Sequence, residues 1–259
     1  MTDDLRTTAK MQDTPEIRIE VLDTLPAFER CVELQLATWG YDGGDVIPRK
    51  MFLVAHKIGG MVLGAFDGDV MIGFAMGLPG FRKGVPYLHS HMLAVLPEYR
   101  NAGIGRRLKL AQRDVALERG FDLMEWTFDP LEIKNAYLNI AKLGAIARRY
   151  EPDFYGASSS PLQGGLPTDR LCAEWWLRSP RVKAVLAGAP LAIDAIETIE
   201  VPAAVYRWKQ SEADRGLAAD LQRLNRLALQ DSFVRGLAVV GYALDGERNG
   251  RFLIGRTDL

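Results

Sequence analysis

The sequence has few of the residues on which metal sites and disulfide frameworks depend. Its 259 residues include two cysteines and three histidines. Cys31 and Cys172 lie far apart in the chain and show no CxxC or other metal-ligand spacing. Zinc sites and disulfide frameworks need closely spaced or numerous cysteines. We therefore expect neither a metal nor a disulfide, and the free thiols fit a reducing cytoplasm.

An excess of charge of either sign is also missing. Lys and Arg number 32 and Asp and Glu 33, so the formal net charge is -1. Proteins that bind nucleic acid or an anionic membrane carry clustered positive charge, and neither partner is favoured here. A nucleic-acid-binding module stays a weaker alternative. Small molecules are the expected partners.

Long apolar segments are absent from the sequence. No apolar run approaches the roughly 18 residues that cross a bilayer, and the polar segment from Met1 to Pro15 lacks the apolar core of a signal peptide. We expect a cytoplasmic protein that does not bind a membrane. Because 48% of its residues are hydrophobic, the chain can fill the core of one large domain or two small ones.

Hydrophobic periodicity predicts that strands and helices alternate along most of the chain. Residues 1–15 are expected to be a flexible tail. Strands are predicted at residues 17–22, 61–66, 70–78, 87–96, 121–128 and 171–177. Helices are predicted at residues 25–39, 48–58, 104–119 and 135–148, with Gly144 as an earlier end for the last one. The strand, helix and strand of residues 87–128 form a βαβ unit with parallel strands.

Residues 179–259 are predicted to be an appended C-terminal α/β extension. We expect a strand at 196–201, a helix at 211–233 and a hairpin at 236–244 and 251–255. The helix places Leu217, Leu221 and Leu224 on one face, which we expect to pack on residues 16–178 or on a second subunit, so a homodimer is left open. The order of elements is similar to that of the N-terminus, and a degenerate internal repeat is one alternative.

The loop before the helix at 104–119 carries the most information about function. After Pro97 it reads Arg100-Asn101-Ala102-Gly103-Ile104-Gly105. Free N–H groups in a first helical turn bind anions, and glycines let a phosphate approach the backbone. A Walker A loop would need Lys and Ser or Thr at Arg106 and Arg107, and a dinucleotide fingerprint would need Gly or Ala at Leu108. A glycine-rich turn without a ligand is the remaining alternative.

In this strand-to-helix context the sequence resembles the GNAT superfamily of acyl-CoA-dependent N-acyltransferases. The family signature, Arg or Gln, two residues, Gly, one residue, then Gly or Ala, is complete at Arg100, Gly103 and Gly105. The resemblance covers residues 17–177 and includes a second motif from Asn135-Ala136 to Leu143-Gly144. A predicted bacterial subgroup shares the motifs at residues 90–92, 126–131 and 166–170.

The resemblance implies a mixed α/β (α+β) fold, with a GNAT-like central mixed β-sheet flanked by helices in residues 16–178. It also implies acetyl-CoA or another acyl-CoA as co-substrate. A bulge in the fourth strand and its splaying from the fifth would leave backbone groups of Leu93, Ala94 and Val95 free for the pantetheine arm. One N–H there would stabilise the thioester oxygen as negative charge develops. The remaining expected cofactor-binding residues are Arg100, Asn101, Ala102, Gly103, Ile104, Gly105, Arg106 and Asn135.

The family's reaction is direct attack by an amine on the thioester, without a covalent acyl-enzyme, and the expected acceptor is the primary amine of a small molecule. A protonated amine needs a base, and imidazole titrates near neutral pH. Strand alternation predicts His89 on the same side as His91 and Val95. His89 also stands where lysine-acetylating members of the family have a catalytic Glu. A rate governed by His89 would rise through an apparent pKa of about 6 to 7.5.

Two further residues are candidates for catalysis. Asp129 would orient an ammonium group or a histidine, or would instead form a turn before Pro130. Many GNAT proteins have a tyrosine that protonates the leaving thiolate where this chain has Ile140. Tyr137 from a neighbouring turn, or solvent, would replace it. The missing tyrosine also supports an alternative of another class, a catalytically silent acyl-CoA-binding sensor.

Overall fold

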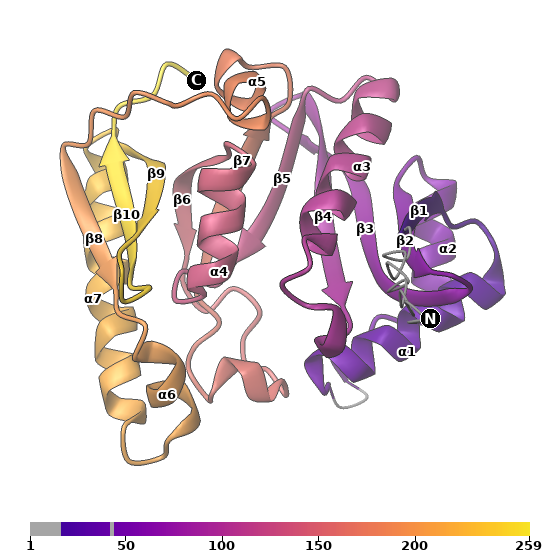
Figure 1. The fold of residues 1–259 in the computed structure, drawn as a ribbon, viewed down its shortest axis with the longest axis horizontal. Coiled ribbons are helices and arrows are strands. Elements are labelled where there is room, and N and C mark those ends of the chain that lie inside the picture. Colours follow the sequence, from indigo (N-terminus) through magenta and orange to yellow (C-terminus); the bar gives the residue numbers. More distant parts are fainter. Residues whose placement is uncertain (1–16, 42–43) are drawn as a thin grey trace, which may run out of the picture.

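A computed structural model describes residues 17–41 and 44–259, so the expected tail lies outside the described residues. Ten strands form one sheet in the order β1-β2-β3-β4-β5-β7-β6-β9-β10-β8 (Figure 1). The strands are β1 (Arg18–Val21), β2 (Met61–Asp67), β3 (Val70–Arg82), β4 (Val85–Val95), β5 (Leu123–Phe128), β6 (Ile146–Glu151), β7 (Arg170–Trp176), β8 (Glu197–Val201), β9 (Ala238–Leu244) and β10 (Gly250–Gly255). This confirms the predicted mixed α/β fold.

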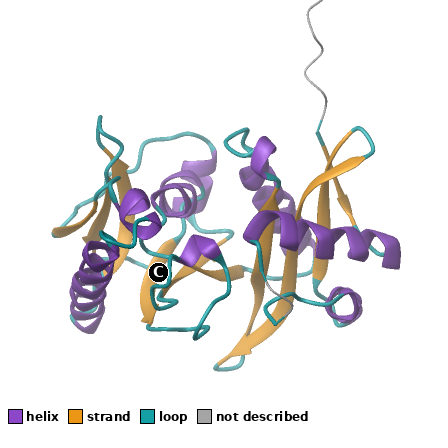
Figure 2. Cartoon of the chain, turned by 90° about the horizontal axis from the view of Figure 1, so that it is seen from below, coloured by secondary structure: helices purple, strands orange, loops and turns teal. Residues whose placement is uncertain are grey.

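Helices flank the sheet on both sides (Figure 2). They are α1 (Leu25–Trp39), α2 (Arg49–Lys57), α3 (Ile104–Glu118), α4 (Ile133–Ala136), α5 (Pro180–Leu186), α6 (Val205–Gln210) and α7 (Arg215–Val234), with a π-helix at Tyr137–Lys142 and 3₁₀ turns at Pro97–Tyr99 and Pro161–Gln163. α1 has both predicted bounds because the Thr24 hydroxyl caps its first turn and Gly40, with φ 60°, ends it. In the described part of the chain, no helix combines the length and apolarity needed to span a membrane.

Two hydrophobic cores lie on opposite faces of strands β2 to β4. Phe28 of α1 and Phe52 of α2 pack with Phe74 in one core. Leu108 of α3 packs with Leu63 in the other. Because side chains alternate along a strand, one strand supplies both cores. The central strands are therefore covered on both faces, and a ligand can reach their backbone where neighbouring strands separate.

β4 contains a β-bulge at His91. Met76 of β3 pairs with Met92, whereas the next residue, Gly77, pairs with Ser90, so His91 is the extra residue. One extra residue reverses the alternation of every side chain beyond it. Leu88 before the bulge and Val95 after it therefore both pack in the α3-side core, although they are seven positions apart and would lie on opposite faces of a regular strand.

The bulge overturns the expectation that His89 and Val95 lie on one side of the sheet. His89 pairs with Leu78, which packs against the core under α1 and α2, whereas Val95 packs on the α3 side. The expected side for His89 was wrong because the pattern of a strand does not show where a residue is inserted. The expected bulge itself is confirmed.

β4 and β5 separate soon after they meet. They pair in parallel at Leu88–Met124 and His89–Glu125, with no further register pair between them in the described structure. Figure 1 shows the two strands diverging toward their C-terminal ends. The predicted βαβ unit and its splayed strands are therefore confirmed. Leu93 to Val95 pair with β3 on one side, and no strand of residues 17–41 or 44–259 pairs with them on the other.

The helix predicted at residues 135–148 is shorter than expected. α4 and the π-helix end at Lys142, and Gly144 then adopts the left-handed conformation with φ 81°. β6 follows and pairs with both β7 and β9. The helical pattern was misleading beyond Gly144 because long-range pairing overrides local propensity in a central strand.

The C-terminal residues continue the same sheet through the pair Ala147–Val239. β8 pairs with β10, the second strand of its hairpin, whereas β1 pairs with β2, the first strand of its own. The similar order of elements at the two ends of the chain therefore does not extend to their pairing in the sheet.

The buried face of α7 differs in part from the predicted one. Leu217 and Leu224 are 50% and 54% exposed, whereas Leu221 packs against the core as expected. The face toward the sheet instead carries Ala218, Gln222, Asn225, Leu229 and Ser232. Gln222 and Asn225 are buried because their amides donate to the backbone carbonyls of Pro167 (2.9 Å) and Glu200 (3.2 Å). The spacing of apolar residues could not predict this face, because two of its buried side chains, Gln222 and Asn225, are polar and are buried through hydrogen bonds.

Candidate active site

Two adjoining cavities lie where β4 and β5 separate. One, of about 340 Å³, is lined by His91 and is called the His91 cavity. The other, of about 760 Å³, is lined by Gly105 and is called the Gly105 cavity. Both are lined by Leu93, Thr127 and Asn135, so they meet at the gap between the strands.

The start of α3 forms one wall of the Gly105 cavity. Gly103, with φ 78°, precedes the helix, and no side chain caps its first turn. The free N–H groups of such a turn attract an anion. Gly105 adds no side chain to this wall, and a Cβ atom there would stand in ordinary contact with Leu93, 3.5 Å from its Cδ2. The loop and strand therefore leave room for a phosphate and a narrow chain.

Most of the expected cofactor-binding residues line the Gly105 cavity. They are Leu93, Val95, Arg100, Asn101, Gly103, Ile104, Gly105, Arg106 and Asn135. Ala94 and Ala102 are not among the lining residues: Ala94 is buried in the core under α1 and α2, and Ala102 is exposed. The structure thus brings nine of the eleven expected residues to one cavity.

The guanidinium of Arg100 holds the loop in place. It donates to the carbonyl oxygen of Thr38 at the end of α1 (3.1 Å) and to that of Val95 (3.4 Å). These bonds join three segments that line the Gly105 cavity. Arg100 therefore has a positioning role in the described structure, in addition to its place on the cavity wall.

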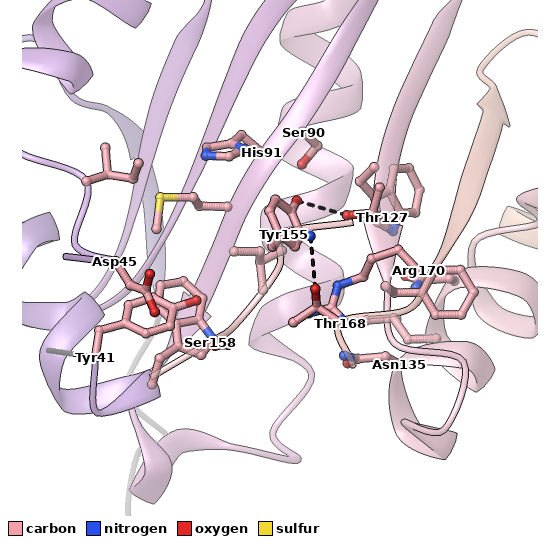
Figure 3. A pocket seen from close by; sticks show the side chains of 18 of the residues that line it. Tyr41, Asp45, Ser90, His91, Thr127, Asn135, Tyr155, Ser158, Thr168 and Arg170 are labelled. Atoms are coloured by element: carbon pink, nitrogen blue, oxygen red, sulfur yellow. Dashed lines mark hydrogen bonds between the residues drawn. The ribbon is translucent and has the colours of Figure 1, made fainter. Parts of the chain in front are cut away.

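The His91 cavity lies between β4, β5 and two loops (Figure 3). Four consecutive β4 residues, Ser90 to Leu93, line it, which a regular strand would not allow. Tyr41 and Asp45 enter from the loop after α1, and Tyr155 forms a hydrogen bond with Thr127 of β5 across 3.0 Å. The bulge is thus what exposes β4 to this cavity.

The two strand histidines occupy different positions relative to the cavities. His91 lines the His91 cavity, and His89 lines neither cavity, although their ring centroids are 5.9 Å apart. Burial lowers the pKa of both imidazoles, that of His89 to about 4 with further lowering by the nearby charges of His91, Lys109 and Arg149. Both rings are therefore neutral near pH 7, and His91 is the one placed to accept a proton in a cavity.

Asp129 and Tyr137 are less available for catalysis than the sequence suggested. Asp129 lines the Gly105 cavity, but its Oδ1 accepts from the backbone N–H of Leu131 (2.8 Å) and its Oδ2 from Lys209 (3.0 Å). These bonds support the turn-forming alternative for Asp129. Tyr137 lines neither cavity, and the ammonium of Lys142 lies 5.2 Å from its ring centroid.

Sequence reasoning missed two groups of residues at the cavities. Lys109 of α3 lines the His91 cavity, and Tyr206 and Gln210 of α6 line the Gly105 cavity. Lys109 follows Gly105 by four residues and so shares its helix face, which was a usable signal. Nothing in the local sequence places α6, at the far end of the chain, beside the α3 loop.

Comparison with known families agrees with this geometry. Residues 28–136 match the model of the acetyltransferase (GNAT) family, and they include the bulged strand, the loop and α3. The match shows that residues 28–136 are similar to a GNAT acetyltransferase domain. Acyl transfer from acetyl-CoA is the class of activity that this match supports. No curated protein sequence matches the chain.

Several solved structures share the fold. The ribosomal-protein-S18-alanine N-acetyltransferase from Escherichia coli is 15% identical, with a TM-score of 0.51 over 63% of this chain and 96% of that one. YncA from Salmonella typhimurium, solved with its cofactor acetyl-CoA, is 17% identical, with a TM-score of 0.51 over 64% and 97%. The NatC complex bound to Gag peptide and CoA is 18% identical, with a TM-score of 0.50 over 61% of this chain and 97% of that one.

Proposed function

We propose that this protein transfers an acetyl or similar short acyl group from acyl-CoA to a primary amine of a small molecule. The observation that carries the proposal is that the uncapped start of α3 and the free edge of β4 line the same cavity. This cavity meets a second one that contains a neutral histidine. The match of residues 28–136 to the acetyltransferase (GNAT) family supports the same reaction class.

The residues of the Gly105 cavity fit the parts of an acyl-CoA. First-turn N–H groups of α3 would bind its pyrophosphate, and the glycines allow this approach. The backbone of Leu93 to Val95 would bind the pantetheine arm as an added strand does, and an N–H there would stabilise the oxyanion. Arg106 and Asn135 line the same cavity and add polar contacts.

The His91 cavity would hold the acceptor amine. His91 takes a proton from the ammonium form, and the free amine attacks the thioester carbonyl carbon. A C–N bond forms, the C–S bond breaks, CoA leaves as a thiolate, and the attacking nitrogen loses its second proton to water to give the amide. Because Tyr137 lines neither cavity, we assign the proton for this thiolate to water.

The proposal is tested by a thiol-release screen of several acyl-CoAs against amino acids, polyamines, aminoglycosides and peptides. We expect CoA release that depends on an amine. Calorimetry that detects no binding of acetyl-CoA, succinyl-CoA or CoA at high protein concentration would overturn it. If CoA binds but no amine causes its release, the alternative of an acyl-CoA-binding sensor is favoured. The buried Ile140, at the position where many GNAT proteins have a tyrosine, also supports that alternative.

A further inference from the structure

The His91 cavity contains a buried lysine that has no carboxylate partner among the described residues. Lys109 is 4% exposed and lines the cavity. Its side-chain nitrogen donates to Ser90 Oγ (2.8 Å) and lies 3.6 Å from the ring centroid of Trp126, and burial lowers the pKa of Lys109 well below its usual value. A buried ammonium normally has an anionic partner, because a hydroxyl and a ring compensate little of its lost hydration.

Two buried hydrogen-bond donors close to Lys109 have no acceptor in the described structure. The indole N–H of Trp126 and the amide nitrogen of Gln112 are both buried without a hydrogen-bond partner. Ser90 donates its own proton to Gln112 Oε1 (2.7 Å), so its hydroxyl hydrogen is already used. Buried donors without acceptors are rare in folded proteins. Trp126 lines the cavity and Gln112 does not, so the indole N–H is the donor there, beside Lys109, that has no acceptor among the described residues.

The carboxylate that does line the cavity is bound elsewhere. Asp45 Oδ2 accepts from the backbone N–H (2.9 Å) and hydroxyl (2.6 Å) of Ser159. Arg170 adds a second cation to the lining, and it donates to the Asp169 carbonyl oxygen (2.9 Å) and to Gln163 Oε1 (3.4 Å), both uncharged acceptors. The cavity thus attracts negative charge at Lys109.

We propose that Lys109 and Trp126 form a subsite for a carboxylate of the substrate, with Ser90 positioning the lysine side chain. The inference rests on the proposed function and narrows its substrate class. The carboxylate belongs either to the acyl chain of the donor, as in succinyl-CoA, or to an acceptor that is an amino acid. A bound carboxylate would favour the charged form of Lys109, and this ammonium with the indole N–H of Trp126 would match one negative charge in a cavity of about 340 Å³.

Two matched substrate pairs separate the sources of the carboxylate. Succinyl-CoA and butyryl-CoA, with one fixed amine, have acyl chains of the same length and differ in the terminal carboxylate. An amino acid and its amide, with acetyl-CoA, differ in the α-carboxylate. We expect the protein to prefer the carboxylated member of one pair by about 100-fold in kcat/KM. Lys109→Met should remove most of that preference.

Two further variants distinguish the loss of the subsite from a general folding defect. Lys57→Met replaces an exposed lysine of α2 and should keep the preference. Ser90→Ala leaves the ammonium in place and should lower the preference by about 10-fold, the effect of one hydrogen bond to a charged group. Each variant is checked by circular dichroism, and Ser90→Ala decides the question if Lys109→Met does not fold.

The outcomes distinguish the two proposals. CoA release without preference in either pair leaves the proposed function standing and overturns the carboxylate subsite. A preference that Lys109→Met and Ser90→Ala both retain also overturns it. No CoA release with any member of either pair would sink both proposals.

Discussion

His91 is the inserted residue of β4, at the point where β4 and β5 diverge. A proton acceptor at this position can reach an amine bound between the two strands. We expect His91→Ala to lower kcat by about 10²-fold, at the low end of general-base contributions, and to leave CoA affinity near that of the wild type. His89→Ala should have the smaller effect because His89 lines neither cavity. Initial rates and calorimetry of both variants test this.

The pH dependence follows from the lowered pKa of His91. A base works in its neutral form, and burial keeps the imidazole neutral to a lower pH than its usual pKa of 6.5. The wild-type kcat should therefore fall as the pH drops below 6.5, rather than through the range of about 6 to 7.5 that an unperturbed imidazole gives. If His91→Ala keeps both its turnover and this acid limb, another group is the base.

Gly105 offers a second test at the scale of one residue. Its φ is not in the left-handed range, so a side chain adds no backbone strain, but a Cβ atom would approach Leu93 and Leu138 at 3.5 and 4.0 Å. We expect Gly105→Val to weaken CoA binding by at least about 10-fold, since one lost or crowded apolar contact changes affinity by that much. Gly216→Val is the matched control: Gly216 is also the second residue of a helix and has open space around it. Equal CoA affinity for the two variants would contradict the placement of the cofactor.

At the scale of the element, α6 is tied to the Gly105 cavity by Lys209. Its ammonium lies 3.0 Å from carboxylate oxygens of both Asp129 and Glu132, and the lysine is 6% exposed. Burial by itself lowers the pKa of Lys209, but the two carboxylates raise it overall, so the lysine is charged. Tyr206 and Gln210 on the same helix line the cavity.

Removing this charge should affect both stability and cofactor binding. Lys209→Met leaves the buried Asp129 carboxylate without its cation, and we expect the free energy of unfolding to fall by about 3 kcal/mol. CoA affinity should fall too, because α6 loses its anchor. Arg207→Met, on the exposed side of α6, is the control. Urea unfolding curves that coincide for the two variants would show that the ion pairs do not hold α6.

At the scale of the whole molecule, the C-terminal residues complete the sheet. β9 covers the edge of β6, and Arg226 of α7 binds both oxygens of the fully buried Asp169 side chain at 2.7 and 2.8 Å. A chain of residues 1–178 would lose these contacts together with α6. It would also expose a sheet edge, which favours association between chains.

We therefore expect residues 1–178 to aggregate or to lack activity. Size-exclusion chromatography, circular dichroism and the CoA-release assay of this fragment beside the full chain measure the effect. A soluble, folded and fully active fragment would show that the domain of residues 16–178 is independent and that α6 has no role at the Gly105 cavity.

The amino-acid sequence alone determined the features that depend on neighbouring residues, namely most helices and strands and the loop before α3. Apolar periodicity located α1, α3 and most strands, because helix and strand periods depend on neighbouring residues. The glycines and arginine of residues 100–105 predicted the loop before α3, because its conformation and free N–H groups are local properties.

The tertiary structure decided which side chains meet. The bulge at His91 arises from the pairing of β4 with β3, and it alone exposes His91 instead of His89 to a cavity. The ion pairs of Lys209 and the place of Lys109 beside Ser90 likewise join segments that are distant in the chain. Periodicity cannot predict such contacts, because register and burial depend on the packing of the whole sheet.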